Sequence, residues 1–231
     1  MDAFYILTLS VAAFVFLHTG VSATPLRRSL IGKSSDGLYR AVFSGLSLIL
    51  IILIWTSYGD ARLSPENALL WTPPAFFRHI GHLIMLAGIL IAVAGYLAMN
   101  PTAMAMGGAL KNDDPAVGAS RVTRHPFLIG VTLWAIAHLL NNGELVAVIL
   151  FGGFLITALA GMASIDRKLA IRDPDGFERL KAVTSITPFA AIITGRNRFA
   201  FGELWWRFAI GGAVFAALWW AHGAIFGVYV S

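Results

Sequence analysis

The sequence predicts an all-α fold, a polytopic membrane helix bundle with about six transmembrane helices. Hydrophobic residues make up 58% of the 231 residues and charged residues only 13%, which is about half the charge of a typical soluble domain. Apolar runs recur along the chain at the length that a helix needs to cross a bilayer, about 20 residues. A soluble globular enzyme is therefore excluded.

Six apolar segments make up the predicted bundle. The first begins at residue 3 with no basic stretch before it, so we interpret it as a helix rather than a cleavable signal peptide. The fourth and fifth are separated only by Asn142-Gly143-Glu144, which predicts a tight transmembrane hairpin. We expect a single transmembrane domain over 1–231 with a cytoplasmic loop at about 166–205. The segments are 3–23, 41–58, 75–98, 126–142, 145–165 and 206–229.

Basic residues gather in the odd-numbered loops. Of the 17 Lys and Arg residues, 15 lie in or beside the first, third and fifth loops, which leaves Arg62 and Arg78. The positive-inside rule predicts that these loops are cytoplasmic and that both termini are periplasmic. The lack of a transit peptide favours a bacterial inner (cytoplasmic) membrane. The 15 residues are Arg27, Arg28, Lys33, Arg40, Lys111, Arg121, Arg124, Arg167, Lys168, Arg172, Arg179, Lys181, Arg196, Arg198 and Arg207.

Charge and cysteine content narrow the partners and cofactors. A net charge of +5 indicates nucleic acid only where a basic patch is free of hydrophobic spans. We therefore expect the lipid bilayer, and no nucleic acid, as a partner. The chain has no cysteine, which excludes disulfides, Cys-ligated zinc, iron–sulfur clusters and thiolate ligation of haem. Histidine remains as the strong ligand for a transition metal.

Histidines are the ionisable residues deep inside the predicted spans, since Arg78 lies one turn into its span, at the interface. An ionisable group within hydrocarbon is costly and by default indicates a functional site. Without carboxylates nearby in the spans, these imidazoles are expected to be neutral, the form that ligates metal. A membrane histidine can instead form an interhelical hydrogen bond, and a place at the interface or in an aromatic belt accounts for those near the outer ends. The five are His18, His79, His82, His138 and His222.

Two stretches resemble the signatures of the NnrU family. The run from Arg124-His125-Pro126 through Gly130 to His138 and Gly143 is similar to the family's core signature. Leu17-His18-Thr19-Gly20 is similar to its first-helix motif, and 164–189 is similar to its long cytoplasmic loop. The resemblance covers nearly the whole chain.

The resemblance implies a haem b membrane protein. The family includes bacterial proteins associated with nitrite and nitric oxide respiration (denitrification), and the plant and cyanobacterial 15-cis-zeta-carotene isomerase, a haem enzyme. His18 and His138 match the positions proposed there as haem ligands, and Arg124 and His125 are expected to contact the cofactor. A hydrophobic polyene substrate or a redox partner is implied. Plant isomerases have a Cys where this chain has Ala135, so a switch of the iron between His and thiolate is excluded.

The depths of the histidines in the membrane leave other pairs of haem ligands as alternatives. His18 lies about 7 Å and His138 about 20 Å from the inner ends of their helices, at 1.5 Å per residue. The offset of about 12 Å along the membrane normal is large for two axial ligands of one haem. His82 and His222 are closer in depth to His138 and are the reserve ligands. For the propionates, Arg27, Arg28, Arg40 and Arg124 supply charge at the inner side, and Arg78 alone at the outer side.

Two other classes of function remain open. Arg124-His125-Pro126 with Gly130 and Asp166 also resembles the pattern of isoprenylcysteine carboxyl methyltransferases, which bind S-adenosylmethionine, although Leu128 replaces a tyrosine. A non-catalytic assembly subunit is the third interpretation, in which Pro126 only starts a helix. In the long loop, Phe177, Leu180, Val183 and 188–193 are expected to lie flat on the cytoplasmic leaflet.

Overall fold

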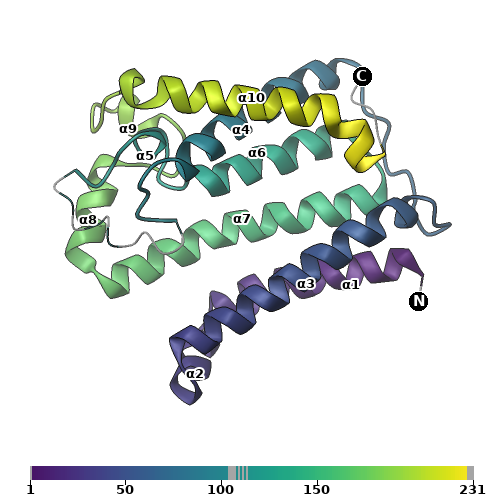
Figure 1. Cartoon of the computed structure of the whole chain (residues 1–231), viewed down its shortest axis with the longest axis horizontal. Coiled ribbons are helices and arrows are strands. Elements are labelled where there is room, and N and C mark those ends of the chain that lie inside the picture. Colours follow the sequence, from purple (N-terminus) through teal and green to yellow (C-terminus); the bar gives the residue numbers. More distant parts are fainter. Residues whose placement is uncertain (1, 104–107, 109, 111, 113, 228–231) are drawn as a thin grey trace. The chain divides into compact units, whose positions relative to one another are not determined.

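The computed structural model is all-α over the residues that it describes, 2–103, 108, 110, 112 and 114–227 (Figure 1). The predicted fold class is therefore confirmed. Apart from one isolated bridge between Leu69 and Glu144, these residues form helices, turns and loops. Lys111 and the end of the sixth predicted span, 228–229, lie outside the described residues. The helices are α1 (Ala3–Phe16), η1 (Leu17–Ser22), α2 (Pro25–Lys33), α3 (Asp36–Arg62), α4 (Phe76–Tyr96), α5 (Ala119–Val122), α6 (Pro126–Asn141), α7 (Leu145–Arg172), α8 (Pro174–Val183), α9 (Ala190–Ile193) and α10 (Phe201–Phe226).

Five helical segments of the described chain are long and apolar enough to cross a membrane: α1 with η1, α3, α4, α7 and α10. The remaining predicted span, the fourth at 126–142, corresponds to α6, which has 16 residues. At 1.5 Å per residue it is about 24 Å long, which is shorter than a hydrocarbon core of about 30 Å. The protein is thus a multi-pass membrane protein in which the apolar helix α6 is shorter than the five candidate spans.

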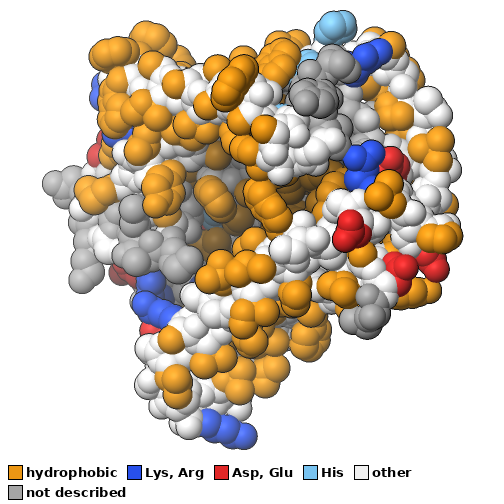
Figure 2. All heavy atoms as spheres, turned by 45° about the vertical axis from the view of Figure 1, so that its right-hand side comes forward, with side chains coloured by type: hydrophobic (Ala, Val, Ile, Leu, Met, Phe, Trp, Pro, Cys, Tyr) orange, Lys and Arg blue, Asp and Glu red, His pale blue; other side chains and the backbone are white. Residues whose placement is uncertain are grey.

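Exposed apolar side chains agree with a lipid environment. Large hydrophobic residues such as Leu48 and Trp220 are 58% and 89% exposed. Figure 2 shows hydrophobic side chains over much of the face drawn, with charged side chains in small groups. Apolar surface of this kind is stable in lipid and would cause association in water.

The chain divides into two compact units. Unit 1 comprises Met1–Gly81, Ala135–Gly161 and Ser231, and unit 2 comprises His82–Trp134 and Met162–Val230. Unit 1 therefore holds α1, η1, α2 and α3 with the first residues of α4, the C-terminal part of α6 and the N-terminal part of α7. Unit 2 holds α5, α8, α9 and α10 with most of α4 and the remaining parts of α6 and α7.

In unit 1, α1 and α3 lie side by side (Figure 1). Leu7 and Val11 of α1 and Ile54 of α3 are buried. Gly153 of α7 allows a close approach to α1, since a Cβ there would lie 2.4 Å from a methyl carbon of Val11. Small residues at such contacts let helix backbones approach in a membrane, where the hydrophobic effect does not drive helices together.

An ion pair within unit 1 attaches the turn between α6 and α7, the predicted hairpin, to the end of α3. Arg62 at the end of α3 donates hydrogen bonds to both carboxylate oxygens of Glu144, at 2.8 and 3.0 Å. The loop before α4 adds a backbone bond from the Leu70 N–H to the Gly143 carbonyl, at 2.8 Å. These hydrogen bonds from Arg62 hold the pKa of the Glu144 carboxyl below its ordinary value.

This pKa shift predicts a pH-dependent contribution to stability. Because the folded pKa of Glu144 is lowered, the contribution is fully present above the ordinary value of 4.5 and is lost as the pH falls through the lowered pKa. We expect Glu144→Gln to reduce the unfolding free energy by about 1 kcal/mol at pH 7, as for a partly exposed pair. The difference between wild type and variant should shrink below pH 4.5, as measured by unfolding in lipid nanodiscs; a constant difference down to pH 3 would contradict the assignment.

In unit 2, α4 and α6 approach closely at two glycines. A Cβ on Gly130 of α6 would lie 2.5 Å from the Ala92 Cβ and 2.8 Å from the Gly88 carbonyl oxygen. Neighbouring Ile91, Ile129 and Met162 form a buried cluster. The glycines are therefore required by backbone proximity between the two helices.

Gly130→Ala should destabilise the protein. The added methyl group has no space against Ala92, and overpacking of this kind typically costs about 1–3 kcal/mol. Gly152→Ala is the matched control, because nothing lies within 4 Å of a Cβ at Gly152 and alanine favours a helix by up to about 1 kcal/mol. Thermal unfolding in detergent should show the two midpoints moving in opposite directions; equal shifts would exclude the close-packing explanation.

The segment predicted as a cytoplasmic loop contains ordered helices. α7 continues seven residues past the predicted end at 165, to Arg172. It ends there because Pro174 follows, and the residue before a proline disfavours the α conformation. Asp173 then accepts a hydrogen bond from the Gly176 N–H, at 2.9 Å, and starts α8.

The prediction that Phe177 and Leu180 lie on the lipid leaflet is wrong. They are 6% and 1% exposed and pack with Leu110 and Leu169 in a buried cluster of unit 2. The sequence pattern marks the apolar face of α8 correctly, but an amphipathic pattern does not distinguish a protein surface from a lipid surface.

Candidate functional site

His18 lies in a π-helical turn, η1, that follows α1 directly. Its Nδ1 is 2.9 Å from the carbonyl oxygen of Phe14. A carbonyl only accepts hydrogen bonds, so Nδ1 carries the proton and the lone pair of the neutral ring is on Nε2. Metal-ligating histidines are commonly oriented by such a bond, and π-turns are frequent at functional sites.

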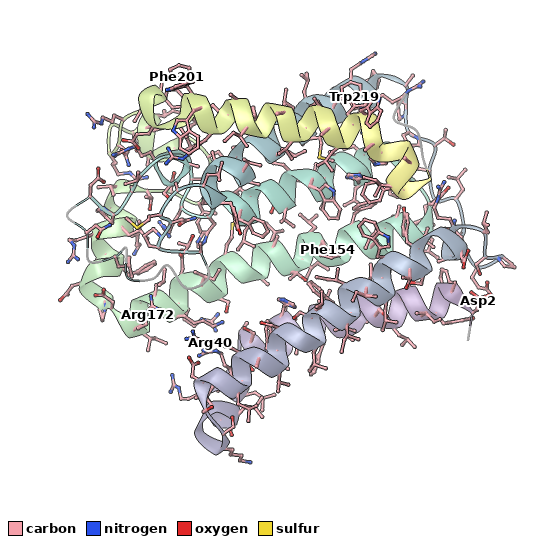
Figure 3. All side chains as sticks on the ribbon, viewed as in Figure 1. Asp2, Arg40, Phe154, Arg172, Phe201 and Trp219 are labelled. Atoms are coloured by element: carbon pink, nitrogen blue, oxygen red, sulfur yellow. The ribbon has the colours of Figure 1, made fainter. Side chains whose placement is uncertain are left out.

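Aromatic rings surround His18 within unit 1. The imidazole lies 4.2 Å from the Phe14 ring centroid and 5.0 Å from that of Phe43. Phe14 is in turn 5.0 Å from Phe154 of α7 (labelled in Figure 3). The Phe14 ring thus contacts both the His18 imidazole and Phe154 of α7.

His138 lies in the last turn of α6 and also packs against α7 within unit 1. Its ring is stacked on Phe151, with centroids 4.3 Å apart and an angle of 20° between the planes. Phe151 also makes an edge contact with Tyr58 of α3, at 6.5 Å. Phe151 and Phe154 are three residues apart and so lie on one face of α7. The two predicted ligands therefore approach the same face of one helix.

The other membrane histidines have different surroundings. In unit 2, His82 is stacked on Trp219 at 4.6 Å, and His222 lies 4.8 Å from Phe226. His79, in unit 1, is exposed. Among the residues that the structure describes, no group of three or more His, Cys, Asp or Glu side chains could hold a metal ion. Haem needs at most two protein ligands.

Arg124 and His125 belong to a buried polar cluster in unit 2. The His125 Nε2 is 2.9 Å from one carboxylate oxygen of Asp166, and Arg124 donates to the other. The Arg124 Nε–H donates to the Thr184 hydroxyl at 3.0 Å, and its guanidinium lies 5.6 Å from the Phe177 ring centroid. Asp166 thus compensates two groups that are almost completely buried.

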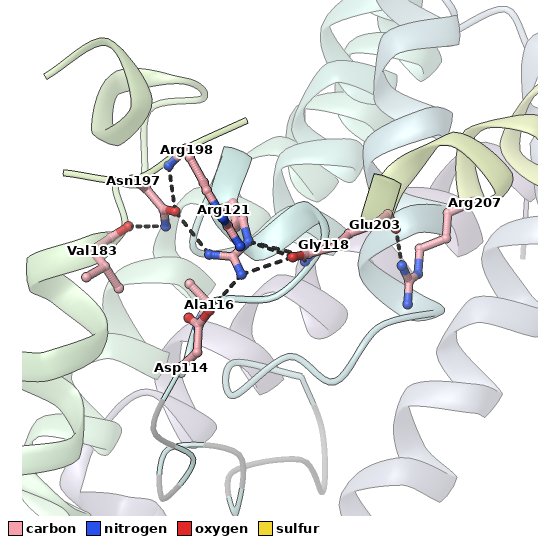
Figure 4. Close-up of polar contacts among 9 residues, drawn as sticks. All are labelled: Asp114, Ala116, Gly118, Arg121, Val183, Asn197, Arg198, Glu203 and Arg207. Atoms are coloured by element: carbon pink, nitrogen blue, oxygen red, sulfur yellow. Dashed lines mark hydrogen bonds and ion pairs between the residues drawn. The ribbon is translucent and has the colours of Figure 1, made fainter. Parts of the chain in front are cut away.

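A second buried arginine organises the neighbouring loops of unit 2 (Figure 4). The Arg121 guanidinium contacts Glu203 at 3.0 Å, Asp114 at 2.6 Å and Asn197 at 3.2 Å. Burial by itself lowers the pKa of Arg121, but the hydrogen bonds to Glu203 and Asp114 outweigh it and raise the pKa. Arg121 therefore stays charged. From α5 it links Glu203 of α10 with Asp114, which precedes α5, and Asn197, which precedes α10.

The four residues predicted to bind a cofactor divide between the two units. His18 and His138 lie in unit 1, and Arg124 and His125 lie in unit 2. Sequence reasoning did not identify Phe14, Phe151 and Phe154 as the rings next to the histidines. The spacing of three between Phe151 and Phe154, directly after the hairpin, is the signal that would have indicated them.

Membrane-spanning helices, with imidazoles packed against aromatic rings, define the class of multi-pass membrane proteins. The chain belongs to the NnrU protein family, whose model matches residues 6–230. It is 29% identical over 198 residues to the chloroplastic 15-cis-zeta-carotene isomerase of Zea mays, and 29% identical over 190 residues to that of Arabidopsis thaliana. These matches cover 84% and 80% of this chain and 52% and 49% of the plant proteins. The chain thus spans about half the length of these relatives, and no solved structure matches it.

Proposed function

We propose that this protein is a membrane haem b protein that isomerises a cis double bond of a hydrophobic polyene, with His18 and His138 as the axial ligands. The carrying observation is the orientation of His18, whose Nδ1–H is fixed by the Phe14 carbonyl at 2.9 Å. The lone pair on Nε2 is the donor that iron accepts. The resemblance to zeta-carotene isomerases supports a polyene of that kind as substrate.

The residues present fit a haem. Its flat macrocycle requires apolar walls, and Phe14, Phe43, Phe151 and Phe154 are available next to the two imidazoles. Bound haem would supply a one-electron or Lewis-acidic centre that lowers the order of a cis double bond. The chain's own part is to ligate through two imidazoles, to orient His18 through Phe14, and to exclude water with aromatic side chains.

The arrangement on α7 reduces the offset along the membrane normal that helix length alone predicts between His18 and His138. Phe151 is stacked on His138, and Phe154 packs on the Phe14 ring that contacts His18. The two α7 residues differ by three positions, or about 4.5 Å of helix rise. Side chains also lean toward the N-terminus of their helix. Because the first and fourth spans run in opposite directions across the membrane, the two imidazoles lean toward each other in depth.

The cellular setting belongs to the same proposal. The distribution of Lys and Arg supports both termini on the side opposite the basic loops, which in a bacterial inner membrane is the periplasm. The relatives named above are chloroplastic. A link to nitrite and nitric oxide respiration, and a redox partner that sets the oxidation state of the haem, follow from the family resemblance.

An optical spectrum tests the haem. The protein is expressed with ample haem supply, purified, and measured oxidised and after dithionite reduction. We expect a Soret band and sharp reduced α and β bands, as given by two imidazole ligands. A colourless protein would refute the proposal.

An S-adenosylmethionine-dependent methyltransferase is the second candidate. The observation that favours it is that Arg124 and His125 both contact Asp166 in unit 2. All three residues belong to the pattern that resembles the methyltransferases. Calorimetric titration with S-adenosylmethionine distinguishes the two candidates. Micromolar affinity that is lost in His125→Ala would favour the methyltransferase, and no heat of binding together with a haem spectrum would favour the first proposal.

A further inference from the structure

A polar groove of about 640 Å³ opens on unit 2 beside the Arg124 cluster. Its volume is within the range of ligand sites, about 300–1,000 Å³, and is much larger than inorganic phosphate needs. Arg124 and Asp166 line it together with the exposed face of α8 and the hydroxyl-rich segment that follows. The lining residues are Arg124, Asp166, Glu178, Lys181, Ala182, Thr184, Ser185, Ile186, Thr187 and Arg196.

Arg196 contributes a cation whose hydrogen bonds go to neutral acceptors. Its guanidinium donates to the carbonyls of Lys181, Ala182 and Thr184 at 3.2, 3.3 and 2.9 Å, and to the Thr194 hydroxyl at 3.0 Å. Carbonyl oxygens hold the group in place without neutralising its charge. The groove therefore has a fixed positive charge at one edge.

The segment that carries Arg196 is anchored on its other side. Asn197 donates to the Val183 carbonyl at 2.7 Å and accepts from buried Arg121 at 3.2 Å (Figure 4). A site held by such contacts loses little conformational entropy when a ligand binds.

The two carboxylates of the groove do not cancel its positive charge. Asp166 is shared between Arg124 and His125. Glu178 pairs with Lys181 at 3.3 Å, but their side chains are 69% and 55% exposed, so the pair is weak and easily exchanged. Arg196 and Lys181 thus remain available to an anion, with the 92% buried Arg124 side chain at the floor.

Hydropathy places this groove at the membrane boundary. The run from Leu145 to Ile165 contains no charged residue and at 21 residues is long enough to cross the hydrocarbon core. Asp166 is the first charged residue after it. The groove wall therefore lies at the level of lipid headgroups, on the side where most Lys and Arg residues gather.

From these observations we propose that the groove binds the phosphate group of an anionic ligand, through Arg196 and Lys181, at the membrane surface. The source is either a phospholipid headgroup or a soluble phosphate ester. The proposal does not depend on haem, because none of the groove residues belongs to the predicted pair of axial ligands.

Native mass spectrometry of the full chain from nanodiscs tests the proposal. The protein is placed in phosphatidylcholine with or without phosphatidylglycerol at about 0.5 M salt, where charges more than a few ångströms apart are screened. We expect one retained phosphatidylglycerol per chain. The double variant Lys181→Gln, Arg196→Gln should reduce this occupancy about tenfold or more, since each basic residue contributes about fivefold to binding of an anionic lipid.

The control is Arg172→Gln with Arg198→Gln, which removes the same charge from exposed positions outside the groove. It should leave occupancy within about twofold, and equal losses in both double variants would overturn the proposal. In pure phosphatidylcholine, calorimetric titration with glycerol 3-phosphate tests the soluble source. Binding there that is lost in Lys181→Gln, Arg196→Gln assigns a soluble ester, whereas binding of neither ligand, or of S-adenosylmethionine alone, refutes the phosphate site.

Discussion

His138→Ala is expected to abolish haem retention, and this is the largest functional effect that the proposed function predicts. The alanine removes the proposed axial ligand together with the ring stacked on Phe151 at 4.3 Å, so bound haem would lose one ligand and a neighbouring ring. His18→Ala should strip the haem or leave a five-coordinate iron. The measurement is the ratio of Soret to protein absorbance, with the reduced spectrum reporting the coordination.

Matched histidine variants separate ligation from general damage. His79 is exposed, and His79→Ala should give a near-native spectrum. Phe14→Leu keeps the carbonyl that orients His18 but removes the ring packed on it, so it should retain haem and shift the midpoint potential. If His82→Ala or His222→Ala removes the haem while His18→Ala does not, the ligand assignment is wrong and the reserve pair takes its place.

The sequence predicts the membrane helices well because hydrophobicity and length determine them. The predicted segment 126–142 differs from α6 by one residue, and 3–23 differs from α1 with η1 by one. The segment 41–58 is nine residues shorter than α3, because Asp36 and Arg62 extend the helix beyond the apolar run. Hydropathy detects the hydrocarbon core and not the helical turns in the interface.

The candidate sites are less predictable because they depend on contacts between distant segments. The sequence identifies His18 as an ionisable residue in a span, but it does not indicate the π-turn that carries it. It places Arg124 and His125 at a helix start, but their pairing with Asp166 joins residues that are 42 and 41 positions away. Periodicity describes one helix at a time and does not specify which side chains meet.

Asp166→Asn is expected to cause the largest loss of stability. The Asp166 carboxylate accepts hydrogen bonds from both Arg124 and His125, whose side chains are 8% and 1% exposed. The variant leaves the Arg124 charge buried without its anionic partner. Removal of one partner from a buried ion pair typically costs about 3–5 kcal/mol.

Two further variants make this last prediction specific, with reversible unfolding in bicelles as the measurement. Asp36→Asn removes a carboxylate that also has two arginine partners, Arg27 and Arg40, but that is 42% exposed; it should cost less than about 1 kcal/mol. Arg124→Met combined with Asp166→Leu removes both charges and should recover most of the loss, because apolar side chains of similar size often replace a buried pair without penalty. If the double variant is less stable than Asp166→Asn, the uncompensated charge is not the cause, and the hydrogen bonds to Thr184 and His125 carry the stability instead.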